Sequence, residues 1–333
     1  MKIAIVGAGV AGSYLYRLLL NKGIHADLFD IEHKTACGIN PCAWGTNAEF
    51  KSLVNNALGD YRPYVIKHIN EILMDDIKTG CELYTINKPM LLRRLNSGDI
   101  SIIESGDSVA LSKYDRVIDA TGVERALLPK IKNDMLLRCV QCRVARVEYE
   151  HECAIEYFWI GYSWRFPLGD GVYHLGCGSL IEDPIKKLEL SGWLDAPAKV
   201  GNIRCDCSGK IRITSPYYSQ PFYVKGENGA PDIIGVGEAI GIVASLAGDG
   251  IVPAMRSCQI LMDNWDKPEE YSKRILTEFA WMKKERGVID KMVNKKRLSI
   301  MDYKVLVDNA KRMGLNLSIK DSMKLIINKI KPF

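Results

Sequence analysis

The sequence lacks the long hydrophobic runs of a membrane-spanning protein. No uninterrupted apolar stretch reaches the ~18 residues that a bilayer requires, and the nearest candidate, residues 233–248, contains Glu238. Nothing precedes the first expected strand, so we expect no signal or transit peptide. There is also no internal repeat and no low-complexity segment. These absences favour a cytoplasmic protein.

The ten cysteines show no evenly spaced disulfide framework, so we expect most of them to be reduced. Two close pairs, Cys139/Cys142 and Cys205/Cys207, suggest a metal or cluster site, because Cys-x-x-Cys is a common zinc spacing. No histidine is placed to help them, and on a strand Cys139 and Cys142 would face opposite sides. We therefore expect structural thiols or a disulfide, and no metal.

The net charge of +5 conceals an uneven distribution. Residues 283–333 contain 14 Lys and Arg against five Asp and Glu, and the rest of the chain carries a net charge of −4. A basic tail suits an anionic membrane surface or an acidic protein partner, and a solvated helical face is the alternative. Residues 323–330 are amphipathic enough for peripheral contact with the inner membrane surface. We expect no nucleic-acid partner.

The chain begins with a short apolar, β-branched segment at residues 3–6, which predicts a buried parallel strand. Gly7, Gly9 and Gly12 follow at the G-x-G-x-x-G spacing and lead into an apolar helix. The first glycine permits a tight turn, the second lets the backbone approach a pyrophosphate, and the third lets helix and strand pack closely. The helix N-terminus, with Ala11 in its first turn, offers N–H groups to phosphates.

A second apolar run ends in Asp30, 18 residues after Gly12, where a carboxylate would accept hydrogen bonds from a ribose diol. The two features together predict a binding site for an adenine dinucleotide. The alternative is a βαβ unit that binds nothing. There is no second G-x-G-x-x-G for a nicotinamide nucleotide.

The length of 333 residues and the 47% of hydrophobic residues allow two domains, or one large domain with an appendage. Strand-like segments without intervening helices from about residue 136 predict an antiparallel sheet. The expected fold class is α/β: a Rossmann-type parallel sheet with an inserted antiparallel sheet domain and a helical C-terminal region. The expected boundaries are 1–125 with 232–265 for the dinucleotide domain, 126–231 for the substrate domain and 266–333 for the basic helical region.

Within these domains, local patterns predict smaller elements. They are a loop at the carboxyl end of the parallel sheet over 31–45, a helix over 48–58, a meander of short strands over 100–119, a strand feeding a glycine-rich turn over 232–241 and a helix over 251–265.

Three stretches stand in an order that resembles the FAD-binding architecture of aromatic hydroxylases. They are the glycine turn with Asp30, the Ala120-Thr-Gly122 turn, and the late glycine turns at 237–241 and 246–251. The resemblance implies FAD as the cofactor. The later contacts it implies come from Thr121, Gly122, Gly237, Glu238, Gly248, Gly250 and Ile251. A helix N-terminus near the pyrimidine part of the flavin would stabilise the anionic reduced ring.

Two further stretches, Asn40-Pro-Cys-Ala-Trp-Gly45 and Gly161-Tyr-Ser-Trp-Arg-Phe-Pro-Leu-Gly169, resemble the archaeal geranylgeranyl reductase family. The resemblance covers roughly residues 1–260. It implies that Cys42 lies beside the isoalloxazine, with backbone contacts from Ala43 and Gly45. It also implies a substrate site walled by Tyr162, Trp164, Phe166 and Pro167. A polyprenyl chain carries no charge, so its site must be apolar and lined by aromatic residues. Cys42 and Tyr162 are the candidate proton donors.

These residues also have simpler explanations. Cys42 could be an inert loop thiol, and the three aromatic residues of the 161–169 stretch could form only core. The sequence departs from the family where Glu238 replaces an Asp and where Lys88 replaces an Arg, which loses the bidentate fork. The chain is also short for the family, so a smaller or differently shaped substrate remains open.

The favoured function is reduction of isoprenoid carbon–carbon double bonds, in geranylgeranyl chains of lipid precursors, by hydride from reduced FAD. Ferredoxin or a reduced nicotinamide nucleotide would supply the electrons. One alternative is an FAD-dependent monooxygenase of an apolar or aromatic compound, which is weakened because Thr121 stands where hydroxylases of this fold carry Asp. The other is a non-catalytic electron-relay flavoprotein whose basic tail docks an acidic partner.

Overall fold

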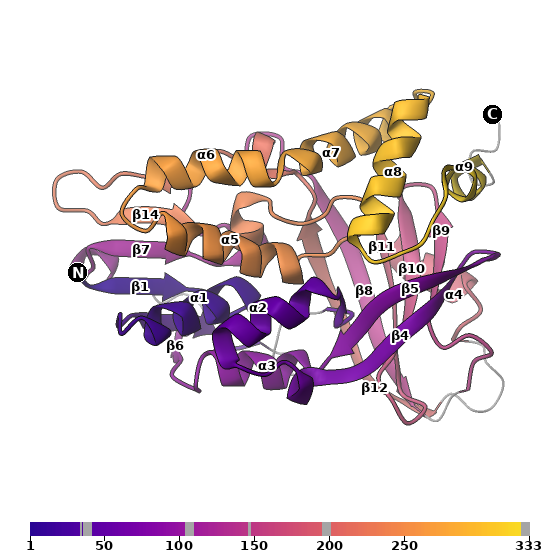
Figure 1. Cartoon of the computed structure of the whole chain (residues 1–333), viewed down its shortest axis with the longest axis horizontal. Coiled ribbons are helices and arrows are strands. Elements are labelled where there is room, and N and C mark those ends of the chain that lie inside the picture. Colours follow the sequence, from indigo (N-terminus) through magenta and orange to yellow (C-terminus); the bar gives the residue numbers. More distant parts are fainter. Residues whose placement is uncertain (34, 36–41, 104–109, 146–147, 195–200, 328–333) are drawn as a thin grey trace.

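The computed structural model describes residues 1–33, 35, 42–103, 110–145, 148–194 and 201–327, with backbone only over 201–206 and 326–327. Figure 1 shows two sheets placed end to end. The helices α6 and α7 run along one side of the molecule from the first sheet to the second. This arrangement confirms the expected fold class, a parallel sheet with a second, antiparallel sheet and a helical C-terminal region.

Sheet A has the strand order β13-β14-β7-β1-β2-β6. All its neighbouring strands are parallel except the edge pair β13 and β14. The strands are β1 (Ile3–Val6), β2 (Asp27–Ile31), β6 (Ser101–Ile103), β7 (Arg116–Asp119), β13 (Tyr223–Val224) and β14 (Asp232–Gly235). The carboxyl ends of β1, β2, β7 and β14 therefore meet at one edge, where ligands bind in sheets of this kind.

The meander expected over residues 100–119 is wrong. β6 lies beside β2 at the sheet edge, whereas β7 lies between β1 and β14, and residues 111–113 form a 3₁₀ turn. β7 takes a central place because Val117 and Ile118 are fully buried on its two faces. A strand buried on both faces is typical of a parallel sheet. Val109, the start of one expected strand, lies outside the described residues.

Helices pack on the face of sheet A that carries Ile3 and Ile5, where they share the largest apolar core of the described chain. Tyr14 and Leu15 of the first helix and Met255 of the fifth are fully buried in this core. The helices are α1 (Val10–Asn21), α2 (Glu49–Leu58), α3 (Lys88–Leu95), α5 (Ile251–Asp263) and α6 (Pro268–Glu278). The expected helices over 48–58 and 251–265 are confirmed as α2 and α5.

Sheet B has the strand order β12-β8-β11-β10-β9-β4-β5-β3. Its pairs are antiparallel except that β4 runs parallel to β9. The strands are β3 (Gly45–Asn47), β4 (Val65–Met74), β5 (Ile77–Ile86), β8 (Leu136–Ala145), β9 (Ala154–Phe158), β10 (Gly161–Pro167), β11 (Tyr173–Ser179) and β12 (Gly201–Arg212). Thus β3, β4 and β5 come from the stretch that the sequence assigns to the dinucleotide domain; the domain boundaries stay a prediction.

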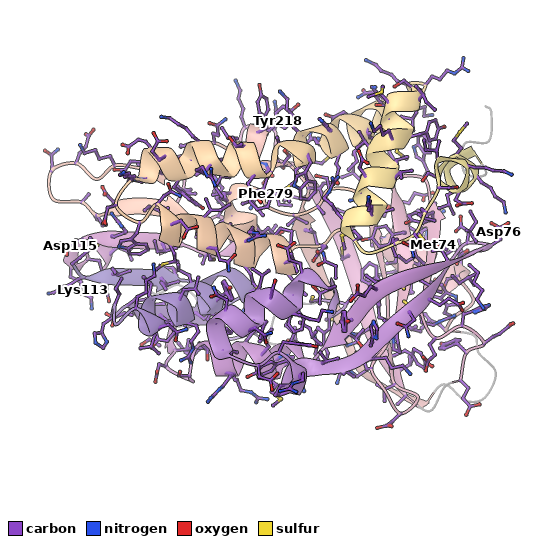
Figure 2. All side chains as sticks on the ribbon, in the orientation of Figure 1. Met74, Asp76, Lys113, Asp115, Tyr218 and Phe279 are labelled. Carbon is purple, nitrogen blue, oxygen red and sulfur yellow. The ribbon has the colours of Figure 1, made fainter. Side chains whose placement is uncertain are left out.

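The remaining helices are α4 (Pro184–Leu190), α7 (Ala280–Val293), α8 (Ile300–Arg312) and α9 (Ile319–Ile327). Backbone bonds fix the α8–α9 connection to β5, because Glu82 N donates to Gly314 O at 2.8 Å and Asn316 N donates to Gly80 O at 3.0 Å. At the tip of the β4–β5 hairpin, Asp76 forms a 2.6 Å ion pair with Lys324 of α9 (Figure 2). Within the described ranges, no helix is long and apolar enough to cross a membrane.

Candidate functional site

The turn between β1 and α1 is built from close backbone contacts. A Cβ on Gly7, whose φ is +104°, would lie 2.3 Å from Ala120 O, and one on Gly12 would lie 1.8 Å from Gly7 O. Gly9 caps α1, and a Cβ there would meet nothing within 4 Å. Gly7 and Gly12 are therefore required by the fold, whereas Gly9 faces open space at the helix N-terminus, which fits a pyrophosphate.

Asp30 lies at the carboxyl end of β2, beside the end of β1 that leads into this turn. Its Oδ1 accepts from Ile31 N at 2.9 Å, and its Oδ2 lies 3.3 Å from His33 Nε2. The carboxylate keeps acceptor capacity, and it occupies the position from which a ribose diol can be bound. His33 is a contact that the sequence reasoning missed.

The turn after β7 is held by Asp119, a fully buried carboxylate that the sequence reasoning also missed. The Thr121 hydroxyl donates to Asp119 Oδ1 at 2.6 Å and accepts from Ala126 N at 2.8 Å. Asp119 Oδ2 accepts from Leu127 N and Leu128 N. Both the Thr121 side chain and its backbone N–H, which donates to Asp119 Oδ1 at 3.1 Å, are therefore used inside their own turn.

The late glycine turn packs directly on the first helix. Gly237 has a φ of +61°, and a Cβ on it would lie 2.8 Å from the Cβ of Ala11. The Glu238 carboxylate accepts from Arg212 N at 2.6 Å and lies 3.6 Å from where a Cβ on Gly122 would be. Burial raises the pKa of Glu238, against the opposing charges of Arg212 and Lys88. The structure thus brings Lys88, Gly122 and Glu238 together. One oxygen of the Glu238 carboxylate accepts a hydrogen bond from the backbone of β12.

The N-terminus of α5 carries a carboxylate as well as the expected positive dipole end. Gly250 caps this helix, and Asp249 Oδ1 accepts from Ile251 N at 3.0 Å. Asp249 Oδ2 is buried and has no hydrogen-bond partner in the described structure. Burial raises the pKa of Asp249 to about 6. An acidic residue between two glycines before an apolar helix is the sequence feature that would have identified it.

Tyr162, Trp164 and Phe166 alternate along β10 and so share one face of sheet B. Trp164 Nε1 donates to Gln141 Oε1 at 3.2 Å, and Gln141 Nε2 donates to Cys42 O at 3.0 Å. The indole lies over Gly176, where a Cβ would be 2.3 Å from two of its ring atoms. Gln141, which the sequence reasoning missed, therefore connects the loop of Cys42 to the aromatic strand.

The residues after Cys42 pack on the same face. A Cβ on Gly45 would lie 3.2 Å from the Phe166 ring, and Ala43 O lies 3.2 Å from His174 Nδ1. Burial lowers the pKa of His174 to about 3, so this imidazole is neutral at ordinary pH. Pro167 closes the strand, and its carbonyl accepts from Thr85 Oγ1 at 2.8 Å. Asn40 and Pro41 of the same sequence stretch lie outside the described residues.

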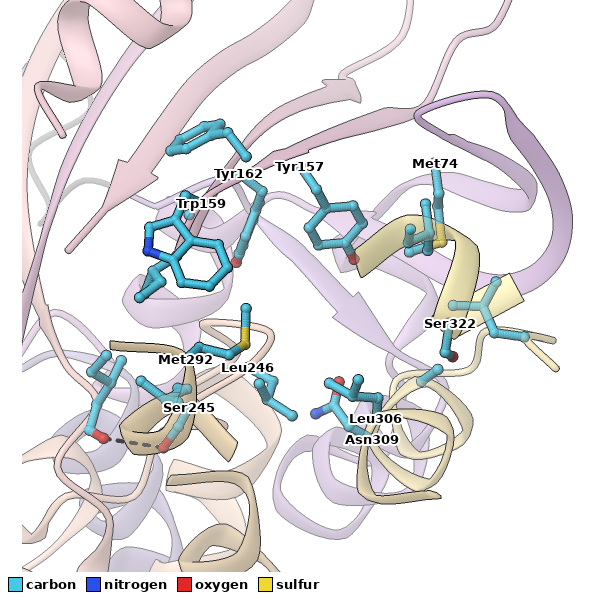
Figure 3. A pocket seen from close by; sticks show the side chains of 18 of the residues that line it. Met74, Tyr157, Trp159, Tyr162, Ser245, Leu246, Met292, Leu306, Asn309 and Ser322 are labelled. Carbon is cyan, nitrogen blue, oxygen red and sulfur yellow. Dashed lines mark hydrogen bonds between the residues drawn. The ribbon is translucent and has the colours of Figure 1, made fainter. Parts of the chain in front are cut away.

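An apolar cavity of about 140 Å³ lies between sheet B and the C-terminal helices α7, α8 and α9 (Figure 3). Tyr162 lines it and donates its hydroxyl hydrogen bond to Ala247 O, in the loop before α5. The Tyr162 ring lies 5.9 Å from Tyr157 inside the cavity and 5.9 Å from Trp164 on the other side. Tyr162 thus stands between the cavity, the Cys42 loop and the N-terminus of α5.

Cys139 and Cys142 face opposite sides of β8, as the strand period requires. A Cβ on Gly178 would lie 3.2 Å from Cys139 Sγ, whereas Cys142 packs with Leu175 on the far face. Neither of them forms a disulfide within the described residues, and nor does Cys207. In the part of the chain that the structure describes, no three His, Cys, Asp or Glu side chains gather as a metal site would need. The side chain of Cys205 lies outside it.

Comparison with known proteins identifies the fold of this chain. No family model matches the chain. An uncharacterised protein of Methanocaldococcus jannaschii is 26% identical, over 99% of this chain and all of the relative. A geranylgeranyl bacteriochlorophyll reductase-like protein from Thermoplasma acidophilum superposes with a TM-score of 0.71 at 18% identity, over 99% of this chain and 96% of the other. The flavin-dependent halogenase CmlS superposes with a TM-score of 0.60 at 16% identity, over 99% and 70%.

These likenesses establish the fold, which is that of flavoproteins and which agrees with the resemblance seen in the sequence. At these identities the comparisons show the fold alone.

Proposed function

We propose that this protein is an FAD-dependent oxidoreductase that reduces carbon–carbon double bonds of isoprenoid chains. The observation that carries the proposal is the apolar cavity beside Tyr162, because an uncharged chain needs an apolar, aromatic-walled site. The same tyrosine touches the loop before α5, so the cavity adjoins the glycine turns that would hold the flavin.

The residues that would contact FAD are distributed along its whole length. The Gly7–Gly12 turn, with Ala11, would hold the pyrophosphate, and Asp30 would bind the adenosine ribose. The turns at Gly122 and at Gly237–Glu238, with Lys88 nearby, would face the ribityl chain. The loop from Cys42 through Ala43 to Gly45, and the segment of Gly248, Gly250 and Ile251, would border the ring. When bound and reduced, the flavin supplies the hydride.

The residues of this chain have distinct tasks in the proposal. Tyr162 holds its proton firmly, because its hydroxyl donates to Ala247 O and burial raises its pKa. It therefore orients the substrate better than it donates a proton. Cys42 is left as the proton donor of the two candidates. Trp164 and Phe166 lie beside the Cys42 loop on the face of β10 that carries Tyr162, and they would exclude water there. Pro167, the last residue of the strand, pairs with Tyr173 and is directed to the opposite face.

The electron donor in the proposal is ferredoxin or a reduced nicotinamide nucleotide. The basic C-terminal region is the proposed contact for an acidic partner or for the membrane surface. Part of its charge is used internally, since Lys291 pairs with Asp302, Arg312 with Glu285 and Lys324 with Asp76. Docking would rely on the basic residues outside these pairs.

The test is anaerobic. The purified yellow protein is reduced with dithionite, geranylgeranylated glycerophospholipid is added, and flavin reoxidation is followed while mass spectrometry monitors the lipid. Reoxidation with two mass units gained per double bond is the expected result. Cys42→Ala should slow this step while flavin binding persists. If the flavin stays reduced until air is admitted, the reductase proposal fails. Oxygen consumption that depends on the substrate would then favour the monooxygenase, and its absence would favour the electron relay.

A further inference from the structure

Six side chains of the cavity lining carry a polar atom. The hydroxyls of Tyr162 and Ser245 donate to backbone carbonyls, and Trp159 contributes an indole N–H. The other three are the Tyr157 hydroxyl from β9, the Asn309 side chain from α8 and the Ser322 hydroxyl from α9. Figure 3 shows all three pointing into the space between the strands and the C-terminal helices. Within the described ranges, neither of these last two hydroxyls nor the Asn309 carbonyl has a hydrogen-bond partner. These polar atoms line the cavity and bond to nothing in the described protein, so they are available to a ligand.

The orientation of Asn309 is fixed from outside the cavity. Its Nδ2 donates to Glu285 Oε1 at 2.8 Å, and a carboxylate can only accept. The Asn309 carbonyl oxygen is therefore left as the acceptor that faces the cavity. Glu285 is fully buried and also pairs with Arg312 at 3.0 Å, which holds this arrangement in place.

The opposite wall supplies a donor. Burial raises the pKa of Tyr157, so its hydroxyl remains protonated. Among the described residues, the lining contains no cationic side chain to receive a phosphate or a carboxylate, and the Asn309 acceptor would repel an anion. The uncharged site thus has an acceptor, the Asn309 carbonyl, on one wall and a donor, the Tyr157 hydroxyl, on the other. A neutral hydroxyl group suits both, because it can donate to Asn309 and accept from Tyr157.

We infer that the cavity binds an apolar alcohol, whose hydroxyl group is held between Tyr157 and Asn309, with Ser322 beside them. Size limits the alcohol further. The volume of about 140 Å³ is close to that of an engineered cavity, about 150 Å³, that accommodates benzene. The part of the alcohol that the cavity encloses is therefore about one or two isoprene units long. Since the Tyr157 and Tyr162 rings lie 5.9 Å apart, the carbons next to the hydroxyl reach Tyr162.

The inference rests on the proposed function only in taking this cavity as the substrate site. Its test is a binding measurement on the oxidised holoprotein, without turnover. Geraniol and the hydrocarbon 2,6-dimethyl-2,6-octadiene, which lacks the hydroxyl, are titrated into wild type and into Tyr157→Phe by calorimetry. The matched control is Tyr173→Phe, a buried tyrosine on the opposite face of the same sheet.

We expect the preference for geraniol over the hydrocarbon to fall about tenfold in Tyr157→Phe, the factor for loss of one neutral hydrogen bond. The affinity for the hydrocarbon should stay unchanged, and Tyr173→Phe should keep the wild-type preference. The inference is overturned if the preference is equal in wild type and Tyr157→Phe, or if the control lowers it equally. If Tyr157→Phe does not fold, Ser322→Ala is judged by the same criterion.

Binding and turnover separate the two proposals. If geraniol binds with the expected preference but no prenyl compound reoxidises the reduced flavin, the alcohol site stands and the reductase is refuted. If a prenyl lipid reoxidises the flavin while the hydroxyl makes no difference to binding, the reductase stands and the alcohol site is refuted.

Discussion

The Gly9→Ala substitution separates the role of the first turn in folding from its role in binding. The backbone of Gly9 has a φ of −67°, which alanine adopts without strain, and the added Cβ meets nothing within 4 Å. Alanine is a poorer helix cap than glycine, but it also lowers the entropy of the unfolded chain. Each effect amounts to about 0.5–1 kcal/mol and they oppose each other. We expect the stability of the flavin-free protein to change by less than about 1 kcal/mol.

Binding should respond differently, because the new methyl group occupies the space that the pyrophosphate needs. Charge-assisted hydrogen bonds to backbone N–H groups are worth about 1.5–3 kcal/mol each. Loss of one of them weakens FAD binding about 10- to 100-fold. The assay is a fluorescence titration of flavin-free protein with FAD, together with denaturant unfolding of the same sample.

Gly12→Ala is the comparison, because its Cβ would lie 1.8 Å from Gly7 O and must displace backbone. It should destabilise the flavin-free protein by about 3 kcal/mol, the upper range for overpacking. Unchanged FAD affinity in Gly9→Ala, with the protein folded, would refute the assignment of the pyrophosphate to this turn. Equal destabilisation by both substitutions would refute the geometry.

Three further predictions concern stability. Gly176→Ala places a Cβ 2.3 Å from the Trp164 ring, so it should cost about 1–3 kcal/mol and alter tryptophan fluorescence; an unchanged denaturation midpoint and spectrum would contradict this. The pKa of Asp249 is raised to about 6, so the stability of the wild type should fall by about 3 kcal/mol as pH rises from about 4 to about 6 and its carboxylate ionises. Asp249→Asn should flatten this dependence in denaturant unfolding between pH 4 and pH 8, and parallel curves for the two proteins would show the assignment to be wrong. Gly287→Ala lies within α7 with free space around its Cβ, so it should raise the unfolding free energy by about 0.5–1 kcal/mol, and a decrease would speak against the helix there.

The sequence by itself determined the elements whose cause is local. The first turn depends on Gly7, Gly9 and Gly12 at fixed spacing, and the helix that follows is predicted from its own apolar residues. The glycine and aromatic patterns also predicted the two-sheet fold class. The shared face of Tyr162, Trp164 and Phe166 follows from strand alternation alone.

The hairpin of β4 and β5 shows where local information ends, since the sequence analysis makes no prediction for residues 65–86. The pairing of these strands shifts register between Val65 and Lys67 and again between Ile69 and Glu71. Such bulges interrupt the period-two alternation by which a strand is recognised. Pairing with β9 and β3 and contact with the 314–316 segment define these strands.

The contacts that join the site were decided by tertiary structure. Gln141 bonds Cys42 across 99 residues of sequence, and Asn309 contributes to a cavity whose other wall lies on β9. In the described structure Asp249 Oδ2 has no hydrogen-bond partner, because the segments packed around it place no donor within reach. Hydrogen bonds and burial between distant segments depend on how the sheets and helices pack against one another, and local sequence patterns do not specify that packing.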